Sequence, residues 1–324
     1  MDLLRHTDID PAPLTGKRVA IIGFGNQGRA QALNLLDSGI DVVVGLRGGS
    51  GSTREAEAKG LTTALLEDAV ASADVIMLLA PDEIHGALYA EIEPHLRQGA
   101  ALGFSHGLSI RFGFVTPRPD LDLFLLAPKG PGTALRQLYT EGKGMIALWA
   151  VEHDATGTAK ALALAYGRAI GCARAGLIAS SFAEEAEADL FNEQMVVWGG
   201  VPALLQAGFE TLVAGGISPE VAFLECVGEL SLLAALIEER GIAGMREAIS
   251  NTAELGAVLG GPKVADQALK ARMATVLNEV RAGKFAAALR REEELGYPAL
   301  DEARAASRKH PIEATRRRLE GDPN

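Results

Sequence analysis

Residues 18–28 of this chain read RVAIIGFGNQG. The first half is a short, continuous apolar run, which is typical of a strand buried on both faces of a parallel sheet. The second half is a G-x-G-x-x-G motif that directly follows this strand and opens a helix. Gly23 permits the tight turn, Gly25 lets the backbone approach a pyrophosphate, and Gly28 allows close packing of helix on strand. The segment therefore predicts a dinucleotide site with the phosphates at the helix N-terminus.

Further strand-like segments follow this motif and alternate with helical patterns. They are residues 41–46, 73–80, 100–104, 121–126 and 144–150. Strands that alternate with helices predict an α/β fold with a doubly wound, Rossmann-type parallel sheet. Beyond residue 182 long helical patterns replace the strands, at 201–214, 219–239 and 266–282. We therefore predict a Rossmann domain over residues 1–181 and an all-α domain over 182–324, with a charged tail, 302–324, that is partly disordered.

The composition and charge of the chain bear on its partners and its compartment. The chain has 324 residues, 48% hydrophobic and 23% charged, with a net charge of −11. This acidic balance argues against nucleic acid or an anionic membrane as the main partner. The first six residues lack the features of a signal peptide, and the apolar stretches elsewhere are interrupted before they reach bilayer length. The two cysteines, Cys172 and Cys226, form no CxxC pattern. A cytoplasmic protein without a membrane span is expected.

The end of the second predicted strand bears on the choice between NAD and NADP. An NAD site usually places a carboxylate there to hold the ribose 2′-hydroxyl. Residues 45–52 read GLRGGSGS and contain no carboxylate. Arg47 offers charge and paired donors for a 2′-phosphate, and Ser50 and Ser52 offer hydroxyl donors. The segment therefore predicts a preference for NADPH over NADH.

Two carboxylate pairs occur at helical spacing in the second half, Asp189 with Glu193 and Glu225 with Glu229. Residues four apart lie on the same face of a helix. Such a pair by itself is usually a solvated helix face. Four clustered carboxylates, however, repel each other unless a hard divalent cation lies among them, and Mg²⁺ prefers oxygen ligands of this kind.

Seven fragments, in the same order along the chain, resemble ketol-acid reductoisomerase, the acetohydroxyacid isomeroreductase of branched-chain amino-acid synthesis. The resemblance covers nearly the whole chain and is to a somewhat divergent member of the short, class I form. The fragments are 23–35 (G-[YF]-G-S-Q-G-H-A-H-A-L-N-L in the family), 81–83 (P-D-E), 104–107 (F-A-H-G), 127–132 (A-P-K-G-P-G), 189–194 (D-L-F-G-E-Q), 224–229 (F-E-x-x-H-E) and 249–254 (I-S-N-T-A-E).

The resemblance implies an Mg²⁺- and NADPH-dependent isomeroreductase in valine and isoleucine biosynthesis. Its substrate would be 2-acetolactate or 2-aceto-2-hydroxybutyrate, which undergoes alkyl migration and then hydride reduction to a 2,3-dihydroxy-3-alkyl acid. Two Mg²⁺ ions would grip the substrate oxygens. The resemblance also implies a knotted helical domain and a homodimer, possibly within a higher oligomer. Each active site would take its two acidic pairs from different subunits, so that a monomer is inactive.

The resemblance further assigns residues to roles. Asp189 would bind both metal ions, Glu193 would complete one metal site, and Glu225 and Glu229 would serve the other, with Glu229 also relaying a proton. The resemblance also implies His106 and Lys129 as catalytic residues and Ser250 as the ligand of the substrate carboxylate. The motif, the end of the second strand and the resemblance together give these cofactor residues: Gly23, Gly25, Asn26, Gln27, Gly28, Arg47, Ser50, Ser52, Asp82 and Gly132.

Without the resemblance, several of these residues have simpler explanations. A single histidine after a strand, such as His106, is more often structural than catalytic. Lys129 lies among prolines and glycines, so it could simply be a charged residue that keeps an exposed loop soluble. Ser250 is equally suited to be the N-cap of the helix that follows it.

The chain also departs from the family pattern beside the proposed ligands. None of the departures removes a metal ligand, but several can tune metal affinity and substrate fit. They lie at Asn26, Arg29, Gln31, Asn192, Trp198, Leu224, Gly228, Ser231 and Leu255. They leave open a divergent paralogue that reduces another small 2-keto acid. A non-enzymatic NADPH-binding regulator and a 6-phosphogluconate-type dehydrogenase are further alternatives, although neither needs the acidic quartet.

Overall fold

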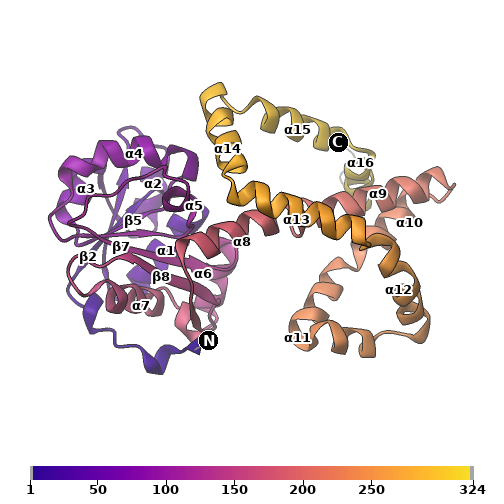
Figure 1. Ribbon diagram of the computed structural model, residues 1–324, viewed down its shortest axis with the longest axis horizontal. Coiled ribbons are helices and arrows are strands. Elements are labelled where there is room, and N and C mark those ends of the chain that lie inside the picture. The colour runs from indigo at the N-terminus through magenta and orange to yellow at the C-terminus, as the bar shows by residue number, and fades with distance from the viewer. Residues whose placement is uncertain (1–2, 322–324) are drawn as a thin grey trace. The chain divides into compact units, whose positions relative to one another are not determined.

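The computed structural model describes residues 3–321, so residues 1–2 of the leader and 322–324 of the charged tail lie outside the described residues. The chain divides into two compact units, Met1–Ala188 and Asp189–Asn324 (Figure 1). The division falls inside the helix α8, Phe182–Met195, whose first residue coincides with the start of the predicted helical domain.

The first unit is built on a nine-stranded sheet with the order β1-β9-β8-β7-β6-β5-β2-β3-β4. Its strands are β1 (Leu3–Leu4), β2 (Arg18–Ile22), β3 (Asp41–Leu46), β4 (Thr62–Leu65), β5 (Val75–Leu78), β6 (Ala101–Phe104), β7 (Asp122–Pro128), β8 (Ala147–His153) and β9 (Leu177–Ala179). The apolar run in β2 is buried from Val19 to Ile22, as a central parallel strand requires.

Six neighbouring strands, from β7 to β4, are parallel, and this confirms the predicted Rossmann-type sheet. The strand order reverses between β2 and β5, where Ile22 is opposite Leu78. Ligands of open α/β sheets bind at such a switch point, beyond the carboxyl ends of the strands. The rest of the sheet is mixed, because β8 runs antiparallel to β7 and β1 antiparallel to β9.

Helices cover both faces of this sheet, and each face has its own apolar core. The helices of the unit are α1 (Asn26–Asp37), α2 (Ser52–Ala58), α3 (Leu66–Ser72), α4 (His85–Ile92), α5 (Leu108–Arg111), α6 (Gly132–Thr140) and α7 (Ala159–Ala169). Helices α1, α6 and α7 contribute Leu35, Leu135 and Tyr166 to one core. Helices α3 and α4 contribute Val70 and Ile92 to the other.

The second unit is helical, as predicted. Its helices after α8 are α9 (Gly200–Ala214), α10 (Pro219–Phe223), α11 (Leu230–Ala248), α12 (Asn251–Val264), α13 (Gln267–Arg281), α14 (Lys284–Leu295), α15 (Pro298–Lys309) and α16 (Pro311–Leu319). The helix predicted over 219–239 is not continuous, because a π-helical segment, Leu224–Gly228, separates α10 from α11. Segments of this kind frequently mark functional sites.

The expectation of a partly disordered tail is wrong for residues 302–321. Helices α15 and α16 occupy most of this stretch, and Ile312 of α16 packs in a small core with Phe209 and Ala222. Arg318 is anchored by an ion pair of 2.8 Å with Glu220. A charged sequence therefore folds here because Ile312 packs on both helices, while His310 contacts Glu210 of α9 and Arg318 pairs with Glu220 of α10.

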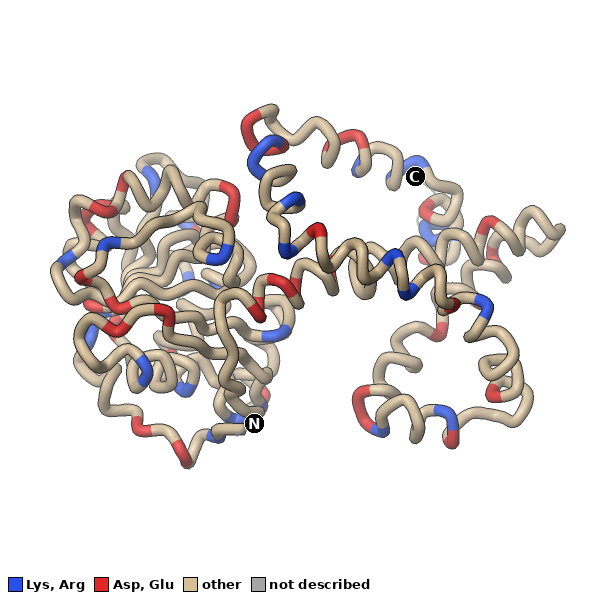
Figure 2. Tube along the Cα trace, viewed as in Figure 1, with Lys and Arg blue, Asp and Glu red and all other residues tan. Residues whose placement is uncertain are grey.

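One stretch, Phe182–Ala214, is long and apolar enough to cross a membrane by length and composition alone, contrary to the expectation from the sequence. It is weak support for a membrane span, because α8 and α9 are separate helices joined by a turn and α8 carries five acidic residues. Figure 2 shows acidic and basic residues interspersed along the trace of both units.

Candidate active site

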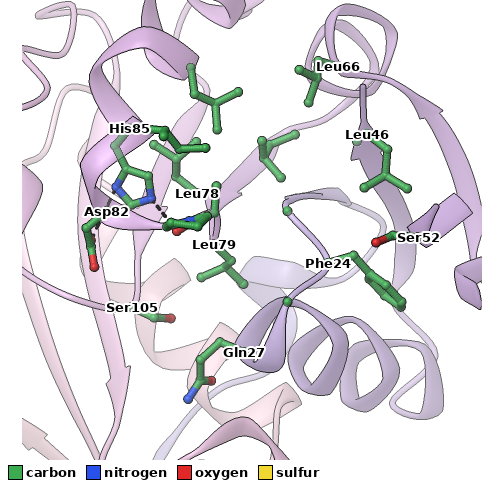
Figure 3. A pocket seen from close by; sticks show the side chains of 18 of the residues that line it. Phe24, Gln27, Leu46, Ser52, Leu66, Leu78, Leu79, Asp82, His85 and Ser105 are labelled. Carbon is green, nitrogen blue, oxygen red and sulfur yellow. Dashed lines mark hydrogen bonds and ion pairs between the residues drawn. The ribbon is translucent and has the colours of Figure 1, made fainter. Parts of the chain in front are cut away.

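A cavity of about 580 Å³ lies at the switch point of the sheet (Figure 3). It is walled by the loops that follow β2, β3, β5 and β6. Eight of the ten residues assigned to the cofactor line it, namely Gly23, Gly25, Asn26, Gln27, Arg47, Ser50, Ser52 and Asp82. The other two pack against the same turn, Gly28 against the carbonyl of Gly23 and Gly132 against that of Asn26.

The three glycines of the motif differ in how much space surrounds the position of a Cβ atom. Gly23 has a φ of +100°, and a Cβ there would lie 2.7 Å from the backbone nitrogen of Ala80. A Cβ on Gly28 would lie 2.1 Å from the carbonyl oxygen of Gly23. Gly25, by contrast, has nothing within 4 Å of its Cβ position. Two glycines thus close the turn, and the third leaves open space at the N-cap of α1, where a pyrophosphate would meet the amides of the helix.

The loop after β7 braces this turn from the side. Gly132 begins α6, and a Cβ there would lie 2.1 Å from the carbonyl oxygen of Asn26. The backbone N–H of Thr133 donates to Oδ1 of Asn26 at 3.0 Å, and Nε2 of Gln27 donates to the carbonyl of Gly130 at 2.9 Å. Residues about a hundred positions apart are therefore locked together at the predicted phosphate site.

His85 forms part of the cavity wall and keeps the loop after β5 in place. Its Nε2 lies 2.9 Å from the carbonyl of Ala80, and its Nδ1 lies 2.7 Å from Oγ of Ser109. Burial lowers the pKa of His85 to about 4, so the ring is neutral at pH 7. A neutral ring that donates to Ala80 accepts from Ser109, which satisfies both nitrogens.

A charged cluster surrounds His106, which follows β6 and lines the cavity. Glu185 of α8 is only 1% exposed and holds three donors. Its carboxylate lies 2.9 Å from Nδ1 of His106, 2.7 Å from the backbone nitrogen of Gly107 and 3.1 Å from Nζ of Lys129. The structure thus brings together His106 and Lys129, the two proposed catalytic residues of this unit, through one buried carboxylate.

The ionisation of Glu185 follows from these contacts. Burial alone would raise the pKa of the carboxyl group, but the hydrogen bond from His106, the charges of His106 and Lys129, and the N–H of Gly107 outweigh it. The net effect holds the pKa of Glu185 below its usual range. The carboxylate therefore holds the imidazole of His106 and the ammonium group of Lys129 in place by hydrogen bonds.

Glu185 is the functional residue that the sequence interpretation missed. It lies in a run of acidic residues at the start of α8, which has the composition of a solvated helix face. Its spacing does contain a signal, because Glu185 precedes Asp189 by four residues and so shares its face of the helix. His106, Glu185 and, one turn further along α8, Asp189 form a group that could hold a metal ion, with ligand atoms within 4.8 Å.

The two predicted acidic pairs lie on different helical segments. Asp189 and Glu193 are on α8, and Glu225 is in the π-helical segment that Glu229 terminates. Within residues 3–321, the four carboxylates do not come together as a single group of metal-capable ligands. The two pairs are therefore separate features of the described chain.

Ser250 is the N-cap of α12, as the structural alternative predicted. Its Oγ accepts the backbone N–H of Ala253 at 3.2 Å. This role uses a lone pair and leaves the hydroxyl hydrogen available for an acceptor. The cap and the proposed binding of a substrate carboxylate are therefore chemically compatible.

One departure from the family pattern has a clear structural explanation. Gln31 is fully buried on α1. Its Nε2 donates to Oγ of Ser105 at 2.9 Å, and its Oε1 accepts from the hydroxyl of Tyr166 at 2.7 Å. The amide thus links the first turns of α1 to the strand end that carries His106. Trp198 and Leu255, in contrast, are 65% and 59% exposed, and nothing in the described chain explains them.

Two family models match the chain. Residues 13–176 match the acetohydroxy acid isomeroreductase NADPH-binding domain, and residues 182–322 match the ketol-acid reductoisomerase C-terminal domain. A curated relative from Kineococcus radiotolerans, named ketol-acid reductoisomerase (NADP(+)), is 51% identical over 98% of this chain and 93% of its own length.

Solved structures give the same result. An NADH-preferring ketol-acid reductoisomerase from an uncultured archaeon is 38% identical and superposes with a TM-score of 0.96 over 99% of both chains. A semialdehyde dehydrogenase NAD-binding protein from Cupriavidus necator, 21% identical with a TM-score of 0.62 over 86% of this chain and 99% of its own, shares the fold alone. The chain belongs to the ketol-acid reductoisomerase family and is an NADP-dependent enzyme.

Proposed function

We propose that this enzyme converts 2-acetolactate and 2-aceto-2-hydroxybutyrate to 2,3-dihydroxy-3-alkyl acids in an Mg²⁺-dependent reaction in the cytoplasm. The observation that carries this proposal is the cluster in which the buried carboxylate of Glu185 contacts both Lys129 and His106, the latter a residue of the cofactor cavity wall. Glu185 is on the same helix as the first acidic pair. Simple cofactor binding needs neither the cluster nor the pairs.

The residues present fit both cofactors. Open space at Gly25, the N-terminus of α1 and Arg47 suit a phosphorylated dinucleotide. The carboxylates of the two acidic pairs are hard oxygen donors of the kind that Mg²⁺ prefers. When bound, NADPH supplies the hydride, and two Mg²⁺ ions supply Lewis-acid and template catalysis at the substrate oxygens.

The protein groups then have distinct tasks. Lys129, held by Glu185, places a positive charge where negative charge develops on the substrate. His106 is oriented through Nδ1 by the same carboxylate. Glu229 is proposed to relay a proton, and the hydroxyl of Ser250 to donate to the substrate carboxylate. The positions of His106 and Lys129 are both fixed by Glu185.

A homodimer with shared active sites is part of the proposal. The helical unit leaves many large apolar side chains more than half exposed, and a surface of this kind needs a partner. These residues are Trp198, Leu204, Leu224, Leu232, Ile242, Leu255, Leu259, Val264 and Leu295. A second copy is the partner we propose, because it would cover this surface and supply the acidic pair that completes each active site.

Arg47 is expected to select NADPH. Arg47→Gln removes the proposed partner of the 2′-phosphate, so kcat/KM for NADPH should fall about ten- to a hundredfold, the value of one charge-assisted hydrogen bond. The value for NADH should change little. Arg54→Gln, an exposed arginine outside the cavity, is the matched control. Wild-type kcat/KM values that are equal for NADH and NADPH would contradict the preference.

The proposed reaction is tested by following NADPH oxidation with 2-acetolactate, with and without Mg²⁺. A parallel reaction uses the already rearranged 3-hydroxy-3-methyl-2-oxobutanoate. Mg²⁺-dependent turnover of both compounds is expected. Turnover of the rearranged compound alone would identify the divergent paralogue that only reduces a 2-keto acid. Activity that survives EDTA would argue against the metal.

A further inference from the structure

A second cavity, of about 590 Å³, lies at the opposite edge of the same sheet. Gly16 and Lys17 precede β2, and Gly39 and Ile40 precede β3, so the cavity is at the amino ends of these strands. The cofactor cavity is at their carboxyl ends. The two cavities are therefore separated by the length of the strands, and a ligand in one does not compete with a ligand in the other.

The second cavity carries an excess of positive charge. Lys17, Arg168 and Arg174 line it, and none of them has a carboxylate partner among the described residues. The two acidic side chains in its wall are already neutralised, Asp37 by Arg136 at 2.7 Å and Asp41 by Arg18 at 2.7 Å.

The charges act on a neighbouring titratable group. The pKa of His6, which also lines the cavity, is lowered by partial burial and then by the charges of Arg168 and Arg174. Both guanidinium groups are therefore close enough to one ring to raise the local potential together.

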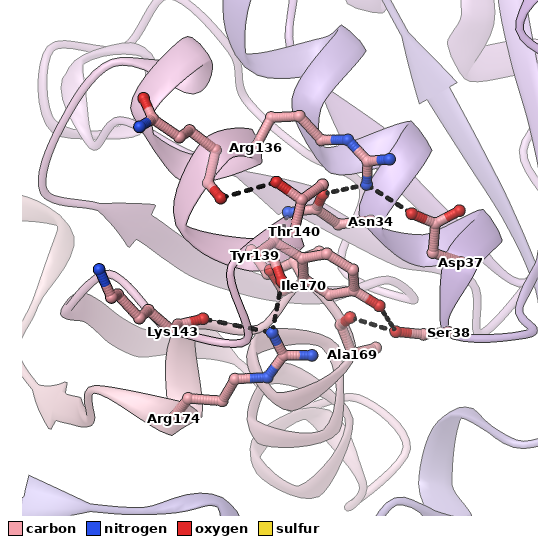
Figure 4. A network of polar contacts seen from close by, with 11 residues as sticks. Asn34, Asp37, Ser38, Arg136, Tyr139, Thr140, Lys143, Ala169, Ile170 and Arg174 are labelled. Carbon is pink, nitrogen blue, oxygen red and sulfur yellow. Dashed lines mark hydrogen bonds and ion pairs between the residues drawn. The ribbon is translucent and has the colours of Figure 1, made fainter.

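The two arginines are held in place before any ligand arrives. Nη1 of Arg168 donates to the carbonyls of His6, at 2.9 Å, and of Ile9. Nη1 of Arg174 donates to the carbonyls of Tyr139, at 2.9 Å, and of Lys143, at 3.2 Å (Figure 4). The guanidinium of Arg174 also stacks on the ring of Tyr139, 4.3 Å from its centroid.

This anchoring uses only one nitrogen of each guanidinium group. Nε and Nη2 of Arg168 and Arg174 have no hydrogen-bond partner within residues 3–321. Half-buried cations without a counter-charge are costly to desolvate, and an anion in the cavity would offset that cost. Fixed guanidinium groups bind carboxylate and phosphate oxygens in pairs, at a low entropy cost.

We propose that this cavity binds a small soluble oxyanion, a phosphate or carboxylate group of a metabolite, at a site separate from the NADPH and substrate sites. Lys17 and the remaining donors of Arg168 and Arg174 would contact its oxygens. The volume is in the usual range for small-molecule sites, and the anion thus has room for an organic remainder.

The test is isothermal titration calorimetry on the intact enzyme saturated with NADPH, so that the cofactor site is already filled. Inorganic phosphate and succinate are titrated separately, with chloride holding the ionic strength constant. We expect saturable binding of one anion per chain. The tighter of the two identifies the source of the oxyanion, phosphate ester or carboxylate. The absence of saturable heat with either anion would overturn the proposal.

Three variants locate the binding. Lys17→Met and Arg174→Met should each weaken it at least tenfold. Lys143→Met removes an exposed charge beside Arg174 but outside the cavity, and it should bind as the wild type does. Because the Lys17 side chain makes no hydrogen bond or ion pair within the described chain, Lys17→Met is informative even if Arg174→Met is poorly folded. Unchanged affinity in both cavity variants would contradict the proposal.

Discussion

Asp189→Asn is expected to lower turnover of 2-acetolactate by about two to three orders of magnitude, because an electrostatic contribution of several kcal/mol from a bound metal is lost. The amide keeps the shape of the side chain but not its charge. The variant should still bind NADPH, since Asp189 does not line the cofactor cavity. Turnover is measured by NADPH oxidation, and cofactor binding by the fluorescence of NADPH.

Glu187→Gln is the matched control for this variant. Glu187 is two residues earlier on the same helix and pairs with Arg111 at 2.9 Å, on a different side of α8 from Asp189. Its loss should leave turnover within a few-fold of the wild type. Full activity of Asp189→Asn would contradict the assignment of this carboxylate to the metal.

The same variant tests whether active sites are shared. Asp189→Asn and Glu229→Gln should each be inactive, because each destroys one of the two acidic pairs. If the pairs of one site come from different subunits, a mixed dimer of the two variants keeps one intact site. Equal co-expression should then restore about a quarter of the wild-type activity, since half of the dimers are mixed and each has one working site. No recovery would show that both pairs of a site belong to one chain.

Glu185→Gln is expected to lower kcat about ten- to a hundredfold, the usual effect of losing a residue that orients catalytic groups. The buried carboxylate accepts from His106, Gly107 and Lys129. Glutamine has one acceptor and one donor at this end, so its amide group would oppose one of these donors. The negative charge that fixes Lys129 is also lost.

A kinetic comparison separates this positioning role from a purely structural one. The variant should keep the wild-type affinity for NADPH while kcat falls, and the assay is run well below its melting temperature. Glu187→Gln again serves as the control. Activity of Glu185→Gln within twofold of the wild type would contradict a positioning role for Glu185.

Much of the sheet domain could be predicted from the sequence because its signals are local. The apolar run in β2, the glycines after it and the start of α1 each depend on neighbouring residues, and all three are where they were predicted. The short strand β4 was missed, because Thr62–Leu65 is only partly buried and lacks a continuous apolar run. The antiparallel direction of β8 relative to β7 could not be predicted either, because the apolar pattern of a buried strand does not indicate which way it runs beside its neighbour.

The sequence by itself thus determined the Rossmann motif, the approximate extent of the helical domain and the types of residue available for cofactor and metal. Only the tertiary structure decided which of these side chains meet. Glu185 is 79 residues from His106 and 56 from Lys129 in the chain, and its environment in a run of acids predicted a solvated surface. The sequence also could not predict that Arg168 and Arg174 line a second cavity without a carboxylate partner. Burial and ionic partnership are properties of segments brought together by folding, so no local pattern contains them.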